Sequence, residues 1–208
     1  MTNLLLQPNY VHALSGFAYE ADSVFRNLKG ANPGKSVAHV STLSSDELIQ
    51  VAKSRKLPIQ SDGFGTLAGR SGLFNIDLLS GFGFVAHSTG SRANELVLVT
   101  RGTNFQHNKF DLATNANIGY GIGPRGNVFH RGFLKTFKSY QSQLVNFVSQ
   151  SGAKRPSTIH CMGHSLGGAL ANLNACMLRD AGFNVCLYTI GAPRVGIVSY
   201  AQDITKQI

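Results

Sequence analysis

A serine between two glycines is the residue best suited to chemistry in this sequence. Ser165 stands in Gly163-His164-Ser165-Leu166-Gly167, which matches the Gly-x-Ser-x-Gly pattern of a nucleophilic serine on a sharp turn between a strand and a helix. The residues two before and two after such a serine must be very small, because side chains there would clash across the turn. We therefore predict that Ser165 is a nucleophile. The backbone N–H of Leu166, at the start of the next helix, is then the natural donor to an oxyanion.

The elements around this serine alternate between strands and helices. Leu96-Val97-Leu98-Val99 is an unbroken apolar run, as in a strand that is buried on both faces of a parallel sheet. The pattern predicts strands over residues 83–87, 95–101, 158–162 and 185–190, and helices over residues 129–152 and 165–179. This alternation indicates βαβ units and an α/β fold.

The first part of the chain has helical and irregular patterns. Apolar residues recur at helical spacing over residues 11–27, which predicts one amphipathic helix. Ser44 and Glu47 have capping-box spacing and predict the start of a second helix that ends before Pro58. Residues 61–75 are rich in glycine and polar groups and are interpreted as a loop.

Length and composition favour a single folded domain. With 208 residues and 43% hydrophobic content, the chain can bury one sizeable core. The formal net charge is +9, but the Lys and Arg residues are scattered, and Lys53, Arg55 and Lys56 are the densest group. No aromatic residues interleave with them in a base-stacking pattern, so we expect no nucleic-acid partner. Contact with an anionic membrane surface stays open.

Cysteine usage and the N-terminal residues bear on the compartment. Cys161, Cys176 and Cys186 form no Cys-x-x-Cys pair, so we expect free thiols, with no disulfide framework and no metal site. The first ten residues lack a basic segment followed by a long apolar run, which speaks against a Sec signal peptide. No stretch approaches the roughly 18 apolar residues of a membrane span. We expect a soluble protein that is cytoplasmic or exported by a Sec-independent route.

Five segments in order give the sequence a resemblance to the class 3 lipases, a branch of the α/β-hydrolases that act on lipid and other carboxylic esters. The likeness covers roughly residues 83–200. The segments are Leu98-Val99-Thr100-Arg101-Gly102-Thr103, Asp111-Leu112-Ala113-Thr114-Asn115, His130-Arg131-Gly132-Phe133, the elbow from Gly163 to Ala171, and Gly191-Ala192-Pro193-Arg194-Val195-Gly196.

This resemblance implies a fold and a reaction. The fold would be an α/β-hydrolase with a mostly parallel central sheet flanked by helices, in which residues 83–208 form the core and residues 1–82 a helical and loop cover of the same domain. Thr103 would complete the oxyanion hole with its hydroxyl and backbone N–H, beside the N–H of Leu166. Ser165 would carry an acyl-enzyme in the hydrolysis of a lipid or other carboxylic ester, without a metal or cofactor.

The acid and base of a catalytic triad are not found in this sequence. In this fold the triad runs serine, acid, histidine along the chain, yet no histidine follows Ser165. The acids that follow are Asp180 and Asp203, and we expect neither to be the triad acid. The histidines upstream are His12, His39, His87, His107, His130, His160 and His164, and we expect structural roles for His130, His160 and His164. We interpret the chain as lacking its C-terminal part and expect residues 1–208 alone to be nearly inactive, the alternative being a non-catalytic binding protein of the same fold.

Overall fold

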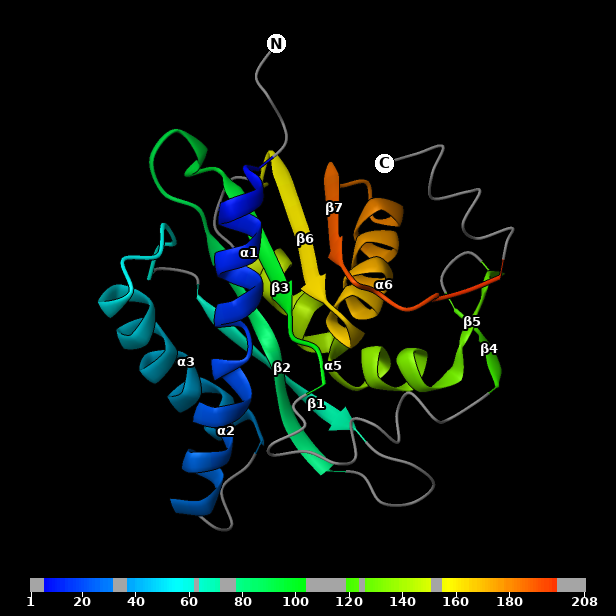
Figure 1. Cartoon of the computed structure of the whole chain (residues 1–208), viewed down its shortest axis with the longest axis horizontal. Coiled ribbons are helices and arrows are strands. Elements are labelled where there is room, and N and C mark those ends of the chain that lie inside the picture. Colours follow the sequence, from blue (N-terminus) through cyan, green and yellow to red (C-terminus); the bar gives the residue numbers. More distant parts are fainter. Residues whose placement is uncertain are drawn as a thin grey trace.

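The described part of the chain is a layered α/β structure. The computed structural model (Figure 1) describes residues 6–31, 37–61, 64–71, 78–103, 119–123, 126–150 and 155–197. The helices are α1 (Pro8–Phe17), α2 (Glu20–Ala31), α3 (Val37–Ser54), α5 (Arg131–Gln150) and α6 (Leu166–Asp180). The strands are β1 (Gly65–Ser71), β2 (Leu78–His87), β3 (Glu95–Thr100), β4 (Tyr120–Ile122), β5 (Val128–His130), β6 (Thr158–His164) and β7 (Val185–Ile190).

Five strands form one sheet in the order β1-β2-β3-β6-β7. β2 pairs antiparallel with both β1 and β3, whereas β3, β6 and β7 are parallel to one another. Within this sheet β2 therefore runs against the direction that the other four strands share. The predicted α/β class is confirmed, with a central sheet that is mixed and whose parallel part is β3, β6 and β7. The strands predicted before and after Ser165 are present.

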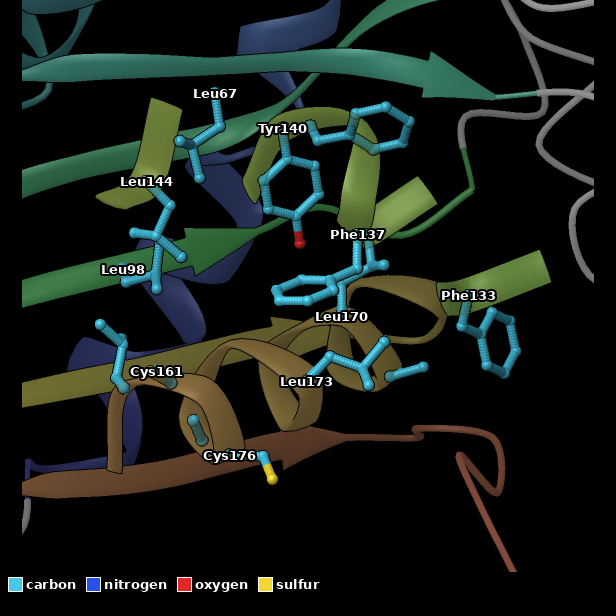
Figure 2. Close-up of a cluster of buried hydrophobic side chains, with 14 of the residues drawn as sticks. Leu67, Leu98, Phe133, Phe137, Tyr140, Leu144, Cys161, Leu170, Leu173 and Cys176 are labelled. Carbon is cyan, nitrogen blue, oxygen red and sulfur yellow. The ribbon is translucent and has the colours of Figure 1, made fainter. Parts of the chain in front are cut away.

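The helices cover the sheet on both faces. α1, α2 and α3 bury one face, where Val97, Val99 and Met162 join their apolar side chains. α5 and α6 bury the opposite face, and Figure 2 shows Tyr140 and Phe137 of α5 pointing toward the side chains of α6 and the sheet. The nucleophile strand β6 is thus covered on both sides, in agreement with the burial of its residues from Thr158 to Gly163.

The prediction of one continuous helix over residues 11–27 is wrong. Residues 11–27 do not form one helix, because α1 ends at Phe17 and α2 begins at Glu20. The N–H of Ala18 still bonds to the carbonyl of Leu14, and that of Tyr19 to the carbonyl of Gly16. The break therefore spans only Ala18 and Tyr19, and the apolar spacing continues across it. The next helix, α3, ends before Pro58 as predicted but begins well before Ser44.

The loop predicted over residues 61–75 contains strand β1. Its glycines mark close contacts with α5 instead of a turn. A methyl group on Gly65 would collide with the ring of Phe147, and one on Gly69 would collide with the hydroxyl of Ser139. Glycine occurs both in loops and in strands that contact a neighbouring helix closely, and the sequence pattern alone does not distinguish these two cases.

The cysteines are free thiols, as predicted. Cys161 and Cys176 are buried, and Figure 2 shows both in the cluster between α6 and the sheet. Burial raises the pKa of the Cys161 thiol far above its usual value. In the ranges that the structure describes, no helix is both long and apolar enough to cross a lipid bilayer.

Candidate active site

Ser165 occupies a strained turn between β6 and α6. Its backbone has φ 53° and ψ −127°, a conformation with positive φ that residues other than glycine rarely adopt. The N–H of Ser165 donates to the carbonyl of Ile190 on β7 at 2.8 Å, which holds the turn against the neighbouring strand. The side chain of Ser165 is half-buried. This is the geometry that the Gly-x-Ser-x-Gly pattern predicts for a nucleophilic serine.

The flanking glycines are required by contacts on the two sides of the turn. A methyl group on Gly163 would lie 2.8 Å from the backbone nitrogen of Gly168 and would collide with the backbone of Gly167. A methyl group on Gly167 would lie 2.5 Å from the carbonyl carbon of Arg101 and would collide with the carbonyl of Thr100. The second glycine is therefore needed because the helix begins against the end of β3, not against β6 alone.

The end of β3 and the start of α6 come together beside Ser165. The hydroxyl of Thr100 donates to the carbonyl of Gly167 at 2.7 Å. A methyl group on Gly102 would lie 3.1 Å from Cβ of Ser165, so the backbone of Gly102 touches the nucleophile. Thr103 follows directly and is buried, with 6% of its surface exposed.

The N–H of Leu166 precedes the hydrogen-bonded part of α6. The first bonds of the helix are donated by Gly168 and Ala169 to the carbonyl of Ser165, and the N–H groups before them belong to the unpaired first turn of a helix. Such groups carry partial positive charge. The structure thus brings Leu166 and Thr103, the two predicted oxyanion residues, to the same end of the sheet as Ser165.

Arg101 makes its contacts inside the protein, where its side chain is fully buried. Its Nε donates to the carbonyl of Gly81 at 2.6 Å, and its Nη1 donates to the carbonyl of Gly102 at 2.7 Å. Its Nη2 lies 3.4 Å from Oδ1 of Asp22, and its guanidinium lies 5.2 Å from the ring centre of Phe82. The sequence motif marked Arg101, but nothing in the pattern indicated Asp22 as its partner.

Tyr19 is a site neighbour that sequence reasoning missed. Its hydroxyl lies 2.8 Å from Nδ1 of His164, the residue before the nucleophile. Tyr19 stands in the short break between α1 and α2, inside the single helix predicted over residues 11–27. No spacing signal joins residues so far apart in the chain.

Two of the described histidines pack against neighbouring side chains. His160 is buried, with Nε2 2.8 Å from Oε2 of Glu95 and Nδ1 3.1 Å from the hydroxyl of Tyr188. Burial lowers the pKa of His160, and the hydrogen bond to Glu95 opposes that shift. His130 stacks on Phe133 with ring centres 4.4 Å apart, and burial lowers its pKa too. Within the described residues, the hydroxyl of Ser165 makes no hydrogen bond to a histidine.

Several predicted elements lie outside the described residues. The acid Asp203, the histidine at 107 and the segment 111–115 are among them. Asp180 lies at the end of α6, a helix length away from Ser165. Among the residues that can be assessed, no group of three or more His, Cys, Asp and Glu side chains could hold a metal ion.

A lipase family model and several sequences named as lipases match this chain. The family model described as "Lipase (class 3)" matches residues 97–208. The chain is 34% identical over 123 residues to "Secreted mono- and diacylglycerol lipase 1" of Fusarium solani, a match that covers 58% of this chain and 36% of that protein. It is 35% identical over 123 residues to "Lipase" of Rhizomucor miehei, covering 56% of this chain and 34% of that protein. The aligned part therefore spans about a third of each relative's length.

Solved structures agree with this result. The mono- and diacylglycerol lipase from Aspergillus oryzae has a TM-score of 0.54 at 25% identity, with 76% of this chain and 56% of that chain covered. The lipase from Rhizopus microsporus var. chinensis has a TM-score of 0.55 at 20% identity, with 97% of this chain and 64% of that chain covered. The second likeness, which extends over the N-terminal helices as well, is a likeness of fold.

Proposed function

Since this chain belongs to the class 3 lipase family and has the α/β-hydrolase fold predicted for it, we propose that the protein hydrolyses carboxylic esters of lipids through an acyl-enzyme on Ser165. The strained backbone of Ser165, with φ 53° beside the bare backbone of Gly102, is the observation that carries this proposal. Such strain exposes the hydroxyl on a sharp turn, where an ester carbonyl can approach it.

The proposed reaction has two steps. In the first, Oγ of Ser165 bonds to the ester carbonyl carbon, its proton passes to a general base, and the carbonyl oxygen becomes an oxyanion. The N–H groups of Leu166 and Thr103, with the Thr103 hydroxyl, donate to that oxyanion. The intermediate then expels the alcohol, and in the second step water releases the acid from Ser165. These steps require neither a metal ion nor a redox cofactor.

The source of the general base defines the activity expected of residues 1–208. No histidine follows Ser165, and the rings of His160 and His164 are bonded to Glu95 and Tyr19. A serine hydroxyl without a base is a weak nucleophile. We propose that residues 1–208 alone turn over esters slowly and that the triad acid and base are not among them.

The substrate is proposed to be an acylglycerol or phospholipid ester at a lipid surface. Two of the relatives are named for mono- and diacylglycerols. The formal net charge of +9 favours an anionic phospholipid over a neutral triglyceride. Tyr120 and Ile122 on β4 expose 64% and 71% of their surfaces, which suits contact with lipid.

We also propose that residues 1–82 and 83–208 form one domain. The described helices α1, α2 and α3 share a core with β2, β3 and β6, and β1 adds a strand to the same sheet. Arg101 is paired with Asp22 of α2. The N-terminal part therefore supports the end of β3, next to the nucleophile.

The test compares the full-length protein with two serine variants. Ser165→Ala removes the proposed nucleophile, whereas Ser157→Ala removes a hydroxyl before the opposite end of β6, where it donates to the carbonyl of Asn94. Hydrolysis of a diacylglycerol emulsion and labelling by a fluorophosphonate probe are measured. We expect both activities in the wild type and Ser157→Ala and neither in Ser165→Ala. Unchanged hydrolysis in Ser165→Ala would refute the enzyme, and lipid binding without labelling or turnover in the wild type would favour a binding protein.

A further inference from the structure

We propose that Arg101 is a positioning residue, which orients the backbone N–H of Thr103 toward the oxyanion by holding the carbonyl of Gly102. This inference rests on the proposed function, because it assigns a role within the same oxyanion hole. Arg101 does not itself touch the ester. It acts through the single peptide group that joins Gly102 to Thr103.

The argument begins with the geometry of that peptide. The Gly102–Thr103 peptide is trans, and in a planar trans peptide the C=O and the N–H point in opposite directions. Nη1 of Arg101 donates to the Gly102 carbonyl at 2.7 Å. A carbonyl that is held on the interior side therefore turns the N–H of Thr103 to the other side of the peptide plane.

Ser165 lies beside this strand end. The backbone of Gly102 is close enough to the nucleophile that an added methyl group would lie 3.1 Å from Cβ of Ser165 and 2.7 Å from the carbonyl oxygen of His164. Glycine also lacks the Cβ that restricts backbone rotation. Without an anchor this peptide could rotate, and the donor would lose its preorganised direction.

The guanidinium is fixed at several points besides Gly102. Nε donates to the carbonyl of Gly81 at 2.6 Å on the neighbouring strand β2, and Nη2 lies 3.4 Å from the buried carboxylate of Asp22 on α2. The backbone N–H of Arg101 donates to the carbonyl of Phe82 at 2.8 Å. With all of its side chain buried, Arg101 has little freedom, so the carbonyl that it holds has little freedom either.

Gly81 explains how the carboxylate of Asp22 on α2 comes close to the guanidinium of Arg101. A methyl group on Gly81 would lie 2.7 Å from the carbonyl carbon of Ala21 and 3.1 Å from the backbone nitrogen of Asp22. The backbones of α2 and β2 therefore touch at this point. The contact brings Asp22, also fully buried, to the guanidinium that holds the Gly102 carbonyl.

A planar fork is needed for this arrangement. Arginine presents its N–H donors in fixed directions, so one side chain reaches Gly81, Gly102 and Asp22 together. Lysine keeps the charge but carries its donors on one freely rotating nitrogen. Arg101→Lys thus preserves the buried charge and removes the fixed grip on the Gly102 carbonyl.

A control variant at a second arginine distinguishes a purely structural role of Arg101 from a positioning role. Arg26 of α2 donates to Oδ2 of the same Asp22 at 2.9 Å. In the part of the chain that the structure describes, Arg26 makes no hydrogen bond to Gly102 or to the end of β3. Arg26→Lys therefore perturbs the same ion-pair cluster without changing the hold on the oxyanion peptide.

The experiment measures kcat and KM of the full-length protein with a soluble short-chain ester, together with binding of an alkylboronic acid. Boron adds to Oγ of Ser165 and places an oxygen in the oxyanion hole, so its affinity reports that hole. Removing one oxyanion donor typically lowers kcat by about 100- to 1,000-fold. For Arg101→Lys, we expect kcat and boronate affinity to fall about 10- to 100-fold, with KM within about twofold of the wild type. Arg26→Lys is expected to leave all of these values within about twofold of the wild type.

Each result decides the proposal. Wild-type kcat and boronate affinity in a folded Arg101→Lys would overturn it, as would equal losses in Arg101→Lys and Arg26→Lys. If Arg101→Lys does not fold, Asp22→Glu replaces it, because the longer side chain displaces the guanidinium; an unchanged kcat in that variant also overturns the proposal. A wild type without Ser165-dependent turnover refutes the proposed function, a result distinct from all of these.

Discussion

The hydroxyl of Tyr19 lies 2.8 Å from Nδ1 of His164, which ties the break between α1 and α2 to the residue before Ser165. A methyl group on Gly102 would collide with that same hydroxyl. Tyr19 therefore fills the space that the bare backbone of Gly102 leaves beside the elbow. Through this contact, the N-terminal helices reach the side of the nucleophile turn.

Tyr19→Phe keeps the ring and removes this hydrogen bond. We expect the free energy of unfolding to fall by about 0.5–1.5 kcal/mol, the usual net value of one hydrogen bond. Urea unfolding followed by circular dichroism measures the change. Tyr120→Phe is the control, since Tyr120 is 64% exposed and should stay within about 0.5 kcal/mol of the wild type. Equal stabilities of the two variants would mean that the Tyr19–His164 contact contributes nothing.

Gly102→Ala tests the close approach of β3 to the nucleophile. The new methyl group would lie 2.7 Å from the carbonyl oxygen of His164 and 3.1 Å from Cβ of Ser165, so the turn must shift. A misplacement of about 1 Å can slow a reaction roughly 100-fold, and we expect fluorophosphonate labelling of Ser165 in the full-length protein to slow by about 10- to 100-fold.

The control for Gly102→Ala is Gly16→Ala in α1. A methyl group there meets nothing within 4 Å, and alanine favours a helix over glycine by about 0.5–1 kcal/mol. Labelling should keep its rate while the free energy of unfolding stays level or rises. Similar labelling rates in the two alanine variants would contradict the steric argument.

Local patterns were sufficient to predict the part of the fold around Ser165. The apolar run of β3, the helix after the serine and the following strand β7 each have a pattern that depends on near neighbours in sequence. Gly163 and Gly167 also predicted the sharp turn at Ser165, because such a turn excludes larger side chains at these two positions. The α/β class and the place of the nucleophile followed from these features.

Contacts between distant residues could not be predicted in the same way. Asp22 and Arg101 are far apart in sequence, and they meet because Gly81 lets α2 touch β2. Glycine-rich β1 was interpreted as a loop, since the sequence does not show the α5 side chains that pack on it. A periodic pattern likewise does not reveal the break at Tyr19, because both helices bury the same kind of face.

The strain at Ser165 gives a stability prediction that needs no substrate. With φ 53° and ψ −127°, the position favours glycine, and strained conformations of this kind cost on the order of 1–3 kcal/mol. We expect Ser165→Gly to have a larger free energy of unfolding than Ser165→Ala by about 1 kcal/mol or more. Urea unfolding of the two inactive variants measures the difference. A more stable alanine variant would show that the turn is not strained.

His160 makes stability depend on pH. Burial lowers its pKa, so below roughly pH 6.5 the unfolded chain binds a proton that the folded protein resists, and the free energy of unfolding falls with pH by up to about 1.4 kcal/mol per unit. The ring faces Glu95, Tyr188 and, through Glu95, Arg92. We expect His160→Gln to flatten this slope between about pH 7.5 and pH 5.5, whereas the exposed His12, changed to Gln, leaves it as in the wild type. The slopes are measured by urea unfolding at each pH. Parallel slopes in the wild type and both variants would show that folding does not change the proton uptake of His160, so the burial of its ring would have no effect on stability.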